Sequence, residues 1–123
     1  MSWLGDFLFG RKSEEWYKKE LEYLYSRRHQ RIDYVARKTK QRERGDEQSI
    51  EKSFALGLPS ISEAESQVRE INKQIEKIIK DMRKYGCNVP KDQYIEGLSN
   101  DLKRYVYTAA QIQEFLKKFV PTV

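Results

Sequence analysis

The sequence predicts an all-α protein, and three observations support this fold class. Apolar residues recur at helical spacing over long stretches. The 123 residues include only three prolines and six glycines, which is few for a fold built from many turns. Signals that begin and end helices stand at the edges of the periodic stretches. We expect three segments: an amphipathic N-terminal segment (1–12), a basic helical arm with a short connecting helix (13–58), and an αα-hairpin (59–123).

The basic helical arm begins with a long amphipathic helix that we expect to run from Ser13 to Arg44. Ser13 suits the N-cap, and acidic residues follow it in the first turn, where they favour the positive end of the helix dipole. Gly45 is expected to end the helix behind a last turn rich in cations. Asp46 can then cap a short helix that continues to Leu56.

The net charge of the chain is concentrated in the second half of this helix. Residues 27–44 carry eight basic side chains and two acidic ones, whereas residues 45–123 carry twelve of each sign. A local excess of this kind is typical of a surface that binds a polyanion, either nucleic acid or an acidic membrane. The other interpretation is an ordinary solvated face, although such faces usually mix the two signs.

On a helical wheel of about 100° per residue, the long helix separates into faces. One is an apolar stripe that contains a single charge, Arg28; the stripe consists of Tyr17, Leu21, Leu24, Tyr25, Ile32, Val35 and Ala36. Beside it lies a basic row, edged by Trp16 and tyrosines, and formed by Arg27, Arg31, Lys38 and Arg42. Rows of arginine and lysine contact phosphates and carry little base information. The predicted nucleic-acid-binding residues are Arg27, Arg31, Arg37, Lys38, Arg42, Arg44, Tyr23 and Tyr34.

The N-terminal segment places apolar residues next to cations. Its candidate membrane or subunit contacts share or adjoin one helical face: Trp3, Leu4, Phe7, Leu8 and Phe9. Met1–Gly5 and Leu8–Lys12 resemble the N-terminal insertion helix of ESCRT-III membrane-remodelling proteins, in which a long basic helix also follows. No apolar run approaches the roughly 18 residues of a membrane span, and no secretory signal is expected.

The second half of the chain predicts a helical hairpin. Ser62 and Glu65 match a capping box at its start. One apolar series follows (Ala64, Val68, Ile71, Ile75, Ile78, Met82, Tyr85), and a second lies beyond Gly86 (Ile95, Leu98, Leu102, Tyr105, Ala109, Ile112, Leu116, Phe119). Pro90 suits the first position of the second helix, and Gly97 to Asn100 favour a break there. We expect the two stripes to face each other in an antiparallel hairpin. Either the basic helix or a second subunit would cover its remaining apolar residues.

Catalytic and metal-binding patterns are absent from the sequence. The single histidine, His29, belongs to no cluster of cysteines and histidines, and we expect it to be one more polar residue of the basic helix. The single cysteine, Cys87, excludes an intramolecular disulfide and is expected to pack as a small apolar residue. Phosphate-binding glycine motifs are also absent. We therefore expect a non-enzymatic protein without a cofactor.

Three functions remain open: a self-assembling protein that binds duplex DNA through its phosphate backbone, a peripheral membrane-binding protein, and a helical adaptor. The layout of a basic helical arm before a helical hairpin resembles the coat proteins of archaeal filamentous viruses, which wrap double-stranded DNA. That resemblance implies a homo-oligomer, or a pairing with a related subunit, and an intracellular or virion location. An anionic membrane surface is the alternative partner.

Overall fold

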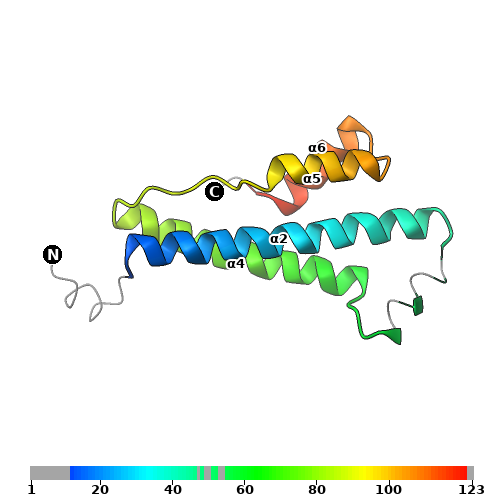
Figure 1. Ribbon diagram of the computed structural model, residues 1–123, viewed down its shortest axis with the longest axis horizontal. Coiled ribbons are helices and arrows are strands. Elements are labelled where there is room, and N and C mark those ends of the chain that lie inside the picture. The colour runs from blue at the N-terminus through cyan, green and yellow to red at the C-terminus, as the bar shows by residue number, and fades with distance from the viewer. Residues whose placement is uncertain (1–11, 47, 49–50, 53–54, 122–123) are drawn as a thin grey trace.

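The chain folds into helices, as the sequence predicts (Figure 1). The computed structural model describes residues 12–46, 48, 51–52 and 55–121. Its helices are α2 (Glu14–Glu43), α4 (Ile61–Lys84), α5 (Ile95–Arg104) and α6 (Ala109–Phe119). No strand occurs among the described residues. The all-α fold class is confirmed.

The long basic helix has the predicted bounds. The Ser13 side chain accepts a hydrogen bond from the Trp16 backbone N–H at 3.1 Å, so Ser13 is the N-cap of α2. The helix ends at Glu43, and Gly45 follows with a φ of +77°. Within the short helix expected from Asp46 to Leu56, residues 48, 51–52 and 55 are helical, and the Leu56 N–H donates to the Lys52 carbonyl at 3.0 Å. Residues 47, 49–50 and 53–54 lie outside the described ones.

The start of α4 differs from the predicted one. Ser60 is the N-cap and accepts a hydrogen bond from the Glu63 backbone N–H at 3.1 Å, so the helix begins two residues before the expected capping box at Ser62. The buried stripe of α4 also differs from the predicted series: Ile79 is buried where Ile78 was expected, Ile61 is buried as well, and Tyr85 is half-buried at the C-cap. Ile78 is only partly buried and packs at the edge of the core.

A helical hairpin is present, but its two arms are α2 and α4 rather than α4 and the C-terminal helices. Figure 1 shows α4 running along most of α2. One apolar cluster joins the N-terminal half of α2 to the C-terminal half of α4 through residues such as Leu21, Leu24 and Ile75. A second cluster joins the other halves and also receives α5 and α6. The prediction that the two heptad stripes face each other is therefore wrong.

The second heptad series is divided between two helices. The chain breaks at residues 105–108 instead of 97–100, and α5 begins at Ile95, well after Pro90, so Pro90 is not at a first helical position. A capping box between Thr108 and Gln111 begins α6. At the expected break site α5 continues, and the Ser99 hydroxyl donates a hydrogen bond to the Ile95 carbonyl at 3.1 Å.

Two tyrosines from the break attach this end of the molecule to α2. The Tyr105 hydroxyl donates a hydrogen bond to Asp33 Oδ1, and the Tyr107 hydroxyl donates one to the Ala36 carbonyl, both at 2.8 Å. Burial raises the pKa of each tyrosine to about 12, and the bond to Asp33 adds to the effect at Tyr105. Both hydroxyls therefore keep their protons at neutral pH and act as donors.

Three helices end in the same hydrogen-bonded turn, and one of the three carries an unfavourable residue. In this Schellman motif the residue after the C-cap takes a positive φ, which favours glycine. Gly45 and Gly86 occupy that position after α2 and α4, whereas Val106 occupies it after α5 with a φ of 69°. The N–H of Val106 bonds to the Lys103 carbonyl and that of Tyr107 to the Leu102 carbonyl, which completes the motif. A β-branched residue in this conformation is strained.

We expect Val106→Gly to raise the free energy of unfolding by about 1 kcal/mol, because a left-handed conformation costs roughly 1–2 kcal/mol for a residue with a Cβ. Val106 is 68% exposed, so little packing is lost. Gly86→Ala is the matched control: a Cβ there meets nothing within 4 Å, and the variant should lose about 1 kcal/mol through strain alone. Urea denaturation of both variants measures the two effects. Destabilisation by Val106→Gly would contradict the strain.

Candidate nucleic-acid interface

Arg28 lies inside the protein and is not part of the basic surface. Its side chain is 4% exposed, and its guanidinium donates to Asp92 Oδ2 at 2.6 Å and to Asn72 Oδ1 at 2.9 Å. Asn72 in turn donates to the Phe119 carbonyl at 2.9 Å. This buried network joins α2, α4, the segment before α5 and the end of α6. The position of Arg28 in the apolar stripe, predicted from the helical wheel, is confirmed.

Two of the predicted nucleic-acid-binding residues are also buried. The Tyr34 hydroxyl donates to the Pro59 carbonyl at 2.6 Å, and the ring is 9% exposed, so it cannot stack on a base. Lys38 is 8% exposed, and its ammonium lies 5.8 Å from the centre of the Tyr34 ring. The predicted roles of both residues in direct contacts are wrong, because both side chains are buried, and Tyr34 is bonded to the segment that leads into α4.

The remaining predicted arginines belong to α2 or, for Arg44, to its C-cap. None of them forms an ion pair with a described residue: Arg27, Arg31, Arg37, Arg42 and Arg44. Other cations of α2 do form such pairs, including Lys18 with Glu14, Lys19 with Glu15 and Lys40 with Glu43. The charge excess in the sequence is therefore carried mainly by side chains that form no ion pair with a described acid.

These arginines span the solvent side of α2 and one of its flanks. At about 100° per residue, Arg37 and Arg44 lie opposite the buried stripe, whereas Arg27, Arg31 and Arg42 lie on a flank. The other flank is covered by α5, as the bond from Tyr105 to Asp33 shows. From residue 27 to residue 44 the helix rises about 25 Å. Arg37, Arg42 and Arg44 are exposed, and Arg27 and Arg31 are half-buried.

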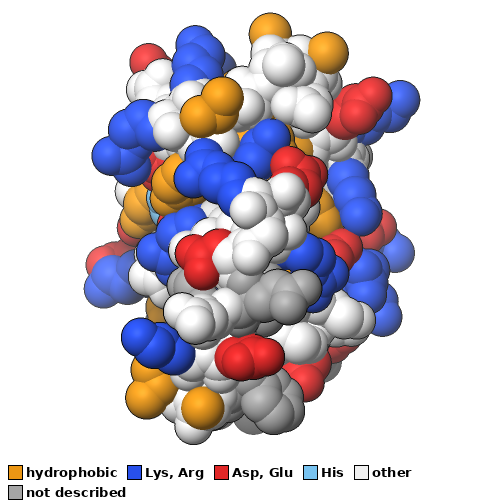
Figure 2. Space-filling model, turned by 90° about the vertical axis from the view of Figure 1, so that its right-hand side faces the viewer, with side chains coloured by type: hydrophobic (Ala, Val, Ile, Leu, Met, Phe, Trp, Pro, Cys, Tyr) orange, Lys and Arg blue, Asp and Glu red, His pale blue; other side chains and the backbone are white. Residues whose placement is uncertain are grey.

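One predicted aromatic residue accompanies the arginines at the surface. Tyr23 is 55% exposed, and the Arg27 guanidinium lies 5.7 Å from the centre of its ring. This cation–π contact places the Arg27 guanidinium beside an exposed aromatic ring. By contrast, the end of the molecule where α2 stops shows cationic and anionic side chains interspersed (Figure 2). The candidate phosphate contacts are the unpaired arginines along α2, of which only Arg42 and Arg44 lie at this end.

The single histidine and the single cysteine both pack against other elements. His29 Nε2 lies 3.9 Å from Asp101 Oδ2, and its ring centre is 5.5 Å from that of Tyr94. His29 thus contributes to the packing of α5 on α2. Cys87 is half-buried beside the cluster formed by α2 and α4, as expected for a small apolar residue. Within the described ranges, no group of three or more His, Cys, Asp or Glu residues could hold a metal ion.

The predicted membrane or subunit contacts in the N-terminal segment (Trp3, Leu4, Phe7, Leu8 and Phe9) lie outside the described residues. Beside that segment, Trp16 is partly exposed, and the Lys12 ammonium lies 5.7 Å from the centre of its ring. A search of the described helices finds none that is both long and apolar enough to cross a membrane.

Sequence reasoning missed the partners of Arg28. The sequence shows that Arg28 lies within an apolar stripe, and a buried arginine requires an acidic partner from elsewhere in the fold. Which of the twelve acidic residues after residue 44 is that partner depends on the tertiary arrangement. Asp92, whose side chain is 7% exposed, lies 64 residues away.

Comparisons with protein-family models, with curated proteins and with solved structures found no match for this chain.

Proposed function

We propose that this chain is a non-enzymatic helical protein that binds duplex DNA through its phosphate backbone, using the unpaired arginines of α2. The observation that carries the proposal is the absence of ion pairs between these five arginines and the described acids. An unneutralised arginine gains more from a phosphate than one that must first leave a carboxylate. A straight helix about 25 Å long between residues 27 and 44 also suits a groove or a phosphate ridge.

The proposed contacts are directed to phosphates and not to bases. Arginine reads a base through bidentate contacts in the major groove, and those usually come with other polar side chains that read adjacent bases. Between residues 27 and 44, the exposed side chains are three arginines, one glutamine and one glutamate: Arg37, Arg42, Arg44, Gln30 and Glu43. We therefore infer affinity that depends weakly on DNA sequence and strongly on salt.

The salt dependence of binding tests the proposal. Four phosphate contacts imply a slope of about −3.6 in log affinity against log salt, at roughly −0.9 per contact. We expect a variant with Arg27, Arg37, Arg42 and Arg44 all changed to alanine to lose most of this slope and to bind DNA at least a hundredfold more weakly at low salt. Fluorescence anisotropy with a labelled duplex, repeated at several salt concentrations, measures both quantities.

The matched control removes four cations from α4 instead, by changing Arg69, Lys73, Lys80 and Lys84 to alanine. All four are exposed, and the change in net charge is the same. This control should keep most of the slope. Equal losses in the two variants would show that only net charge matters and would remove α2 as the interface. A different result would favour the membrane alternative: the wild-type protein binds anionic liposomes as tightly as DNA and loses that binding in the α2 variant.

The proposal extends to self-assembly along the duplex, in the manner of a filament or virion coat. What supports it is a set of exposed apolar side chains, including Trp16 in the first turn of α2 and Leu56 and Leu58 in the segment between α2 and α4. Sedimentation velocity with and without a long duplex tests this part. We expect complexes that grow with DNA length at a fixed ratio of protein to base pairs. Independent binding of single protein molecules along the duplex would contradict self-assembly.

A further inference from the structure

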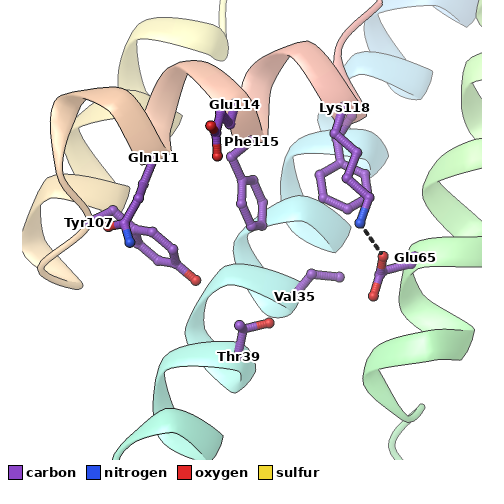
Figure 3. A pocket seen from close by; sticks show the side chains of 9 residues that line it. Val35, Thr39, Glu65, Tyr107, Gln111, Glu114, Phe115 and Lys118 are labelled. Carbon is purple, nitrogen blue, oxygen red and sulfur yellow. Dashed lines mark hydrogen bonds and ion pairs between the residues drawn. The ribbon is translucent and has the colours of Figure 1, made fainter.

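A cleft with an aromatic wall lies beneath α6, where that helix crosses α2 and α4 (Figure 3). Its volume is about 310 Å³, at the lower end of the range for small-molecule sites. Val35 and Thr39 line it from α2, and Glu65 lines it from α4. The other lining residues come from the α5–α6 turn and from α6.

The apolar wall of the cleft consists of three rings in a row. The ring centres of Tyr107 and Phe115 are 5.6 Å apart, and those of Phe115 and Phe119 are 4.9 Å apart. Figure 3 shows Phe115 pointing from α6 into the middle of the cleft. Tyr107 is held in place by its hydrogen bond to the Ala36 carbonyl. The wall therefore offers fixed aromatic surface.

The charged rim of the cleft is acidic overall. Glu65 and Glu114 contribute two negative charges, and Lys118 contributes one positive charge. Lys118 pairs with Glu65 at 3.1 Å, but its side chain is 63% exposed whereas that of Glu65 is 23% exposed. Glu114 forms no ion pair with a described residue. An exposed lysine gains little from a surface ion pair, so another cation can replace it at Glu65.

We propose that this cleft binds a small organic amine with an apolar chain or ring. The ammonium group replaces Lys118 at Glu65 and lies near Glu114, while the apolar part lies against Phe115 and its neighbours. Aromatic faces attract cations, and carboxylates beside them complete the recognition of an ammonium group. An anionic ligand of the same shape would meet two carboxylates and one lysine that is already paired. The cleft thus selects by charge, and this inference does not depend on DNA binding.

The test compares two ligands that differ chiefly in charge, 4-phenylbutylamine and 4-phenylbutyrate. Titrating each into the full chain, followed by amide chemical shifts in ¹H–¹⁵N spectra, should show saturable shifts at Thr39, Gln111 and Phe115 with the amine. The carboxylate should bind at least tenfold more weakly. No saturable binding of the amine, or equal binding of both ligands, would overturn the proposal.

Three variants locate the ammonium group. Glu65→Gln should weaken amine binding at least tenfold, whereas Lys118→Met should strengthen it severalfold because the competing cation is gone. The control Glu70→Gln removes an exposed acid of the same helix that pairs with Lys73 instead, and it should leave affinity unchanged. Circular dichroism establishes that each variant is folded. Unchanged affinity in folded Glu65→Gln would contradict the assigned position.

Discussion

Replacing Arg28 by alanine is expected to lower the free energy of unfolding by about 3–5 kcal/mol, which is the usual cost of removing one member of a buried ion pair. The arginine and its partner Asp92 are almost completely enclosed. Without Arg28, the Asp92 carboxylate keeps one hydrogen bond, from the Tyr94 backbone N–H at 2.8 Å, and its charge is left unpaired. The loss should appear as a lower midpoint in urea denaturation at neutral pH.

The network around Arg28 explains why a single side chain has so large an effect. Its guanidinium lies 5.3 Å from the centre of the Tyr25 ring, and the Tyr25 hydroxyl donates to the Pro90 carbonyl at 3.2 Å. Together with Asp92 and Asn72, these contacts hold the segment between α4 and α5 against the hairpin. That segment has no helix or strand of its own, so it depends on these bonds for its position.

A double-mutant cycle separates the pair from the packing of the arginine stem. Asp92→Ala should also lower the free energy of unfolding by several kcal/mol. The double variant should lose clearly less stability than the two single variants lose together. Arg37→Ala, at an exposed position of the same helix, is the matched control and should change stability by less than about 0.5 kcal/mol. DNA affinity should show the reverse order, falling for Arg37→Ala more than for folded Arg28→Ala. Additive losses at positions 28 and 92 would show that the two side chains do not act as a pair.

The sequence predicted helix ends well where a local signal was present. Ser13 and Gly45 bound the first long helix, and Gly86 ends α4, because capping and a positive φ are properties of a few neighbouring residues. The break between α5 and α6 was missed for the same reason. Its Schellman position carries Val106 instead of glycine, and the heptad spacing continues through Tyr105 and Ala109 without interruption.

The pairing of helices could not be predicted in the same way. A heptad stripe shows which face of α4 is buried but not which helix covers it. Since α2 is long enough to cover almost the whole of α4, the two form the main hairpin, and the shorter α5 and α6 pack on what remains. The same limit applies to the interface. A helical wheel places Lys38 and Tyr34 beside the exposed arginines, but the tertiary structure buries both, and Tyr34 donates to the Pro59 carbonyl.

Introducing aspartate at Ile75 should prevent folding at ordinary temperatures. Ile75 is 1% exposed in the cluster that joins α2 and α4. An unpaired carboxylate there costs several kcal/mol, in addition to the lost apolar burial, and a domain of this size has about 5–15 kcal/mol in total. Far-ultraviolet circular dichroism should show loss of most helical signal. A variant that keeps the wild-type melting temperature would contradict the burial of this position.

Milder substitutions then identify the helix that covers Ile75. We expect Ile75→Val and Leu24→Ala to be coupled by at least about 0.5 kcal/mol, because both residues belong to the cluster between α2 and α4. Ile75→Val and Leu102→Ala should be additive, since Leu102 lies in the other cluster, in α5. The antiparallel hairpin predicted from the heptads alone turns near residue 88 and places Ile75 opposite Leu102, so it requires the opposite pattern. The two cycles, measured by urea denaturation, therefore distinguish the hairpin formed by α2 and α4 from that alternative.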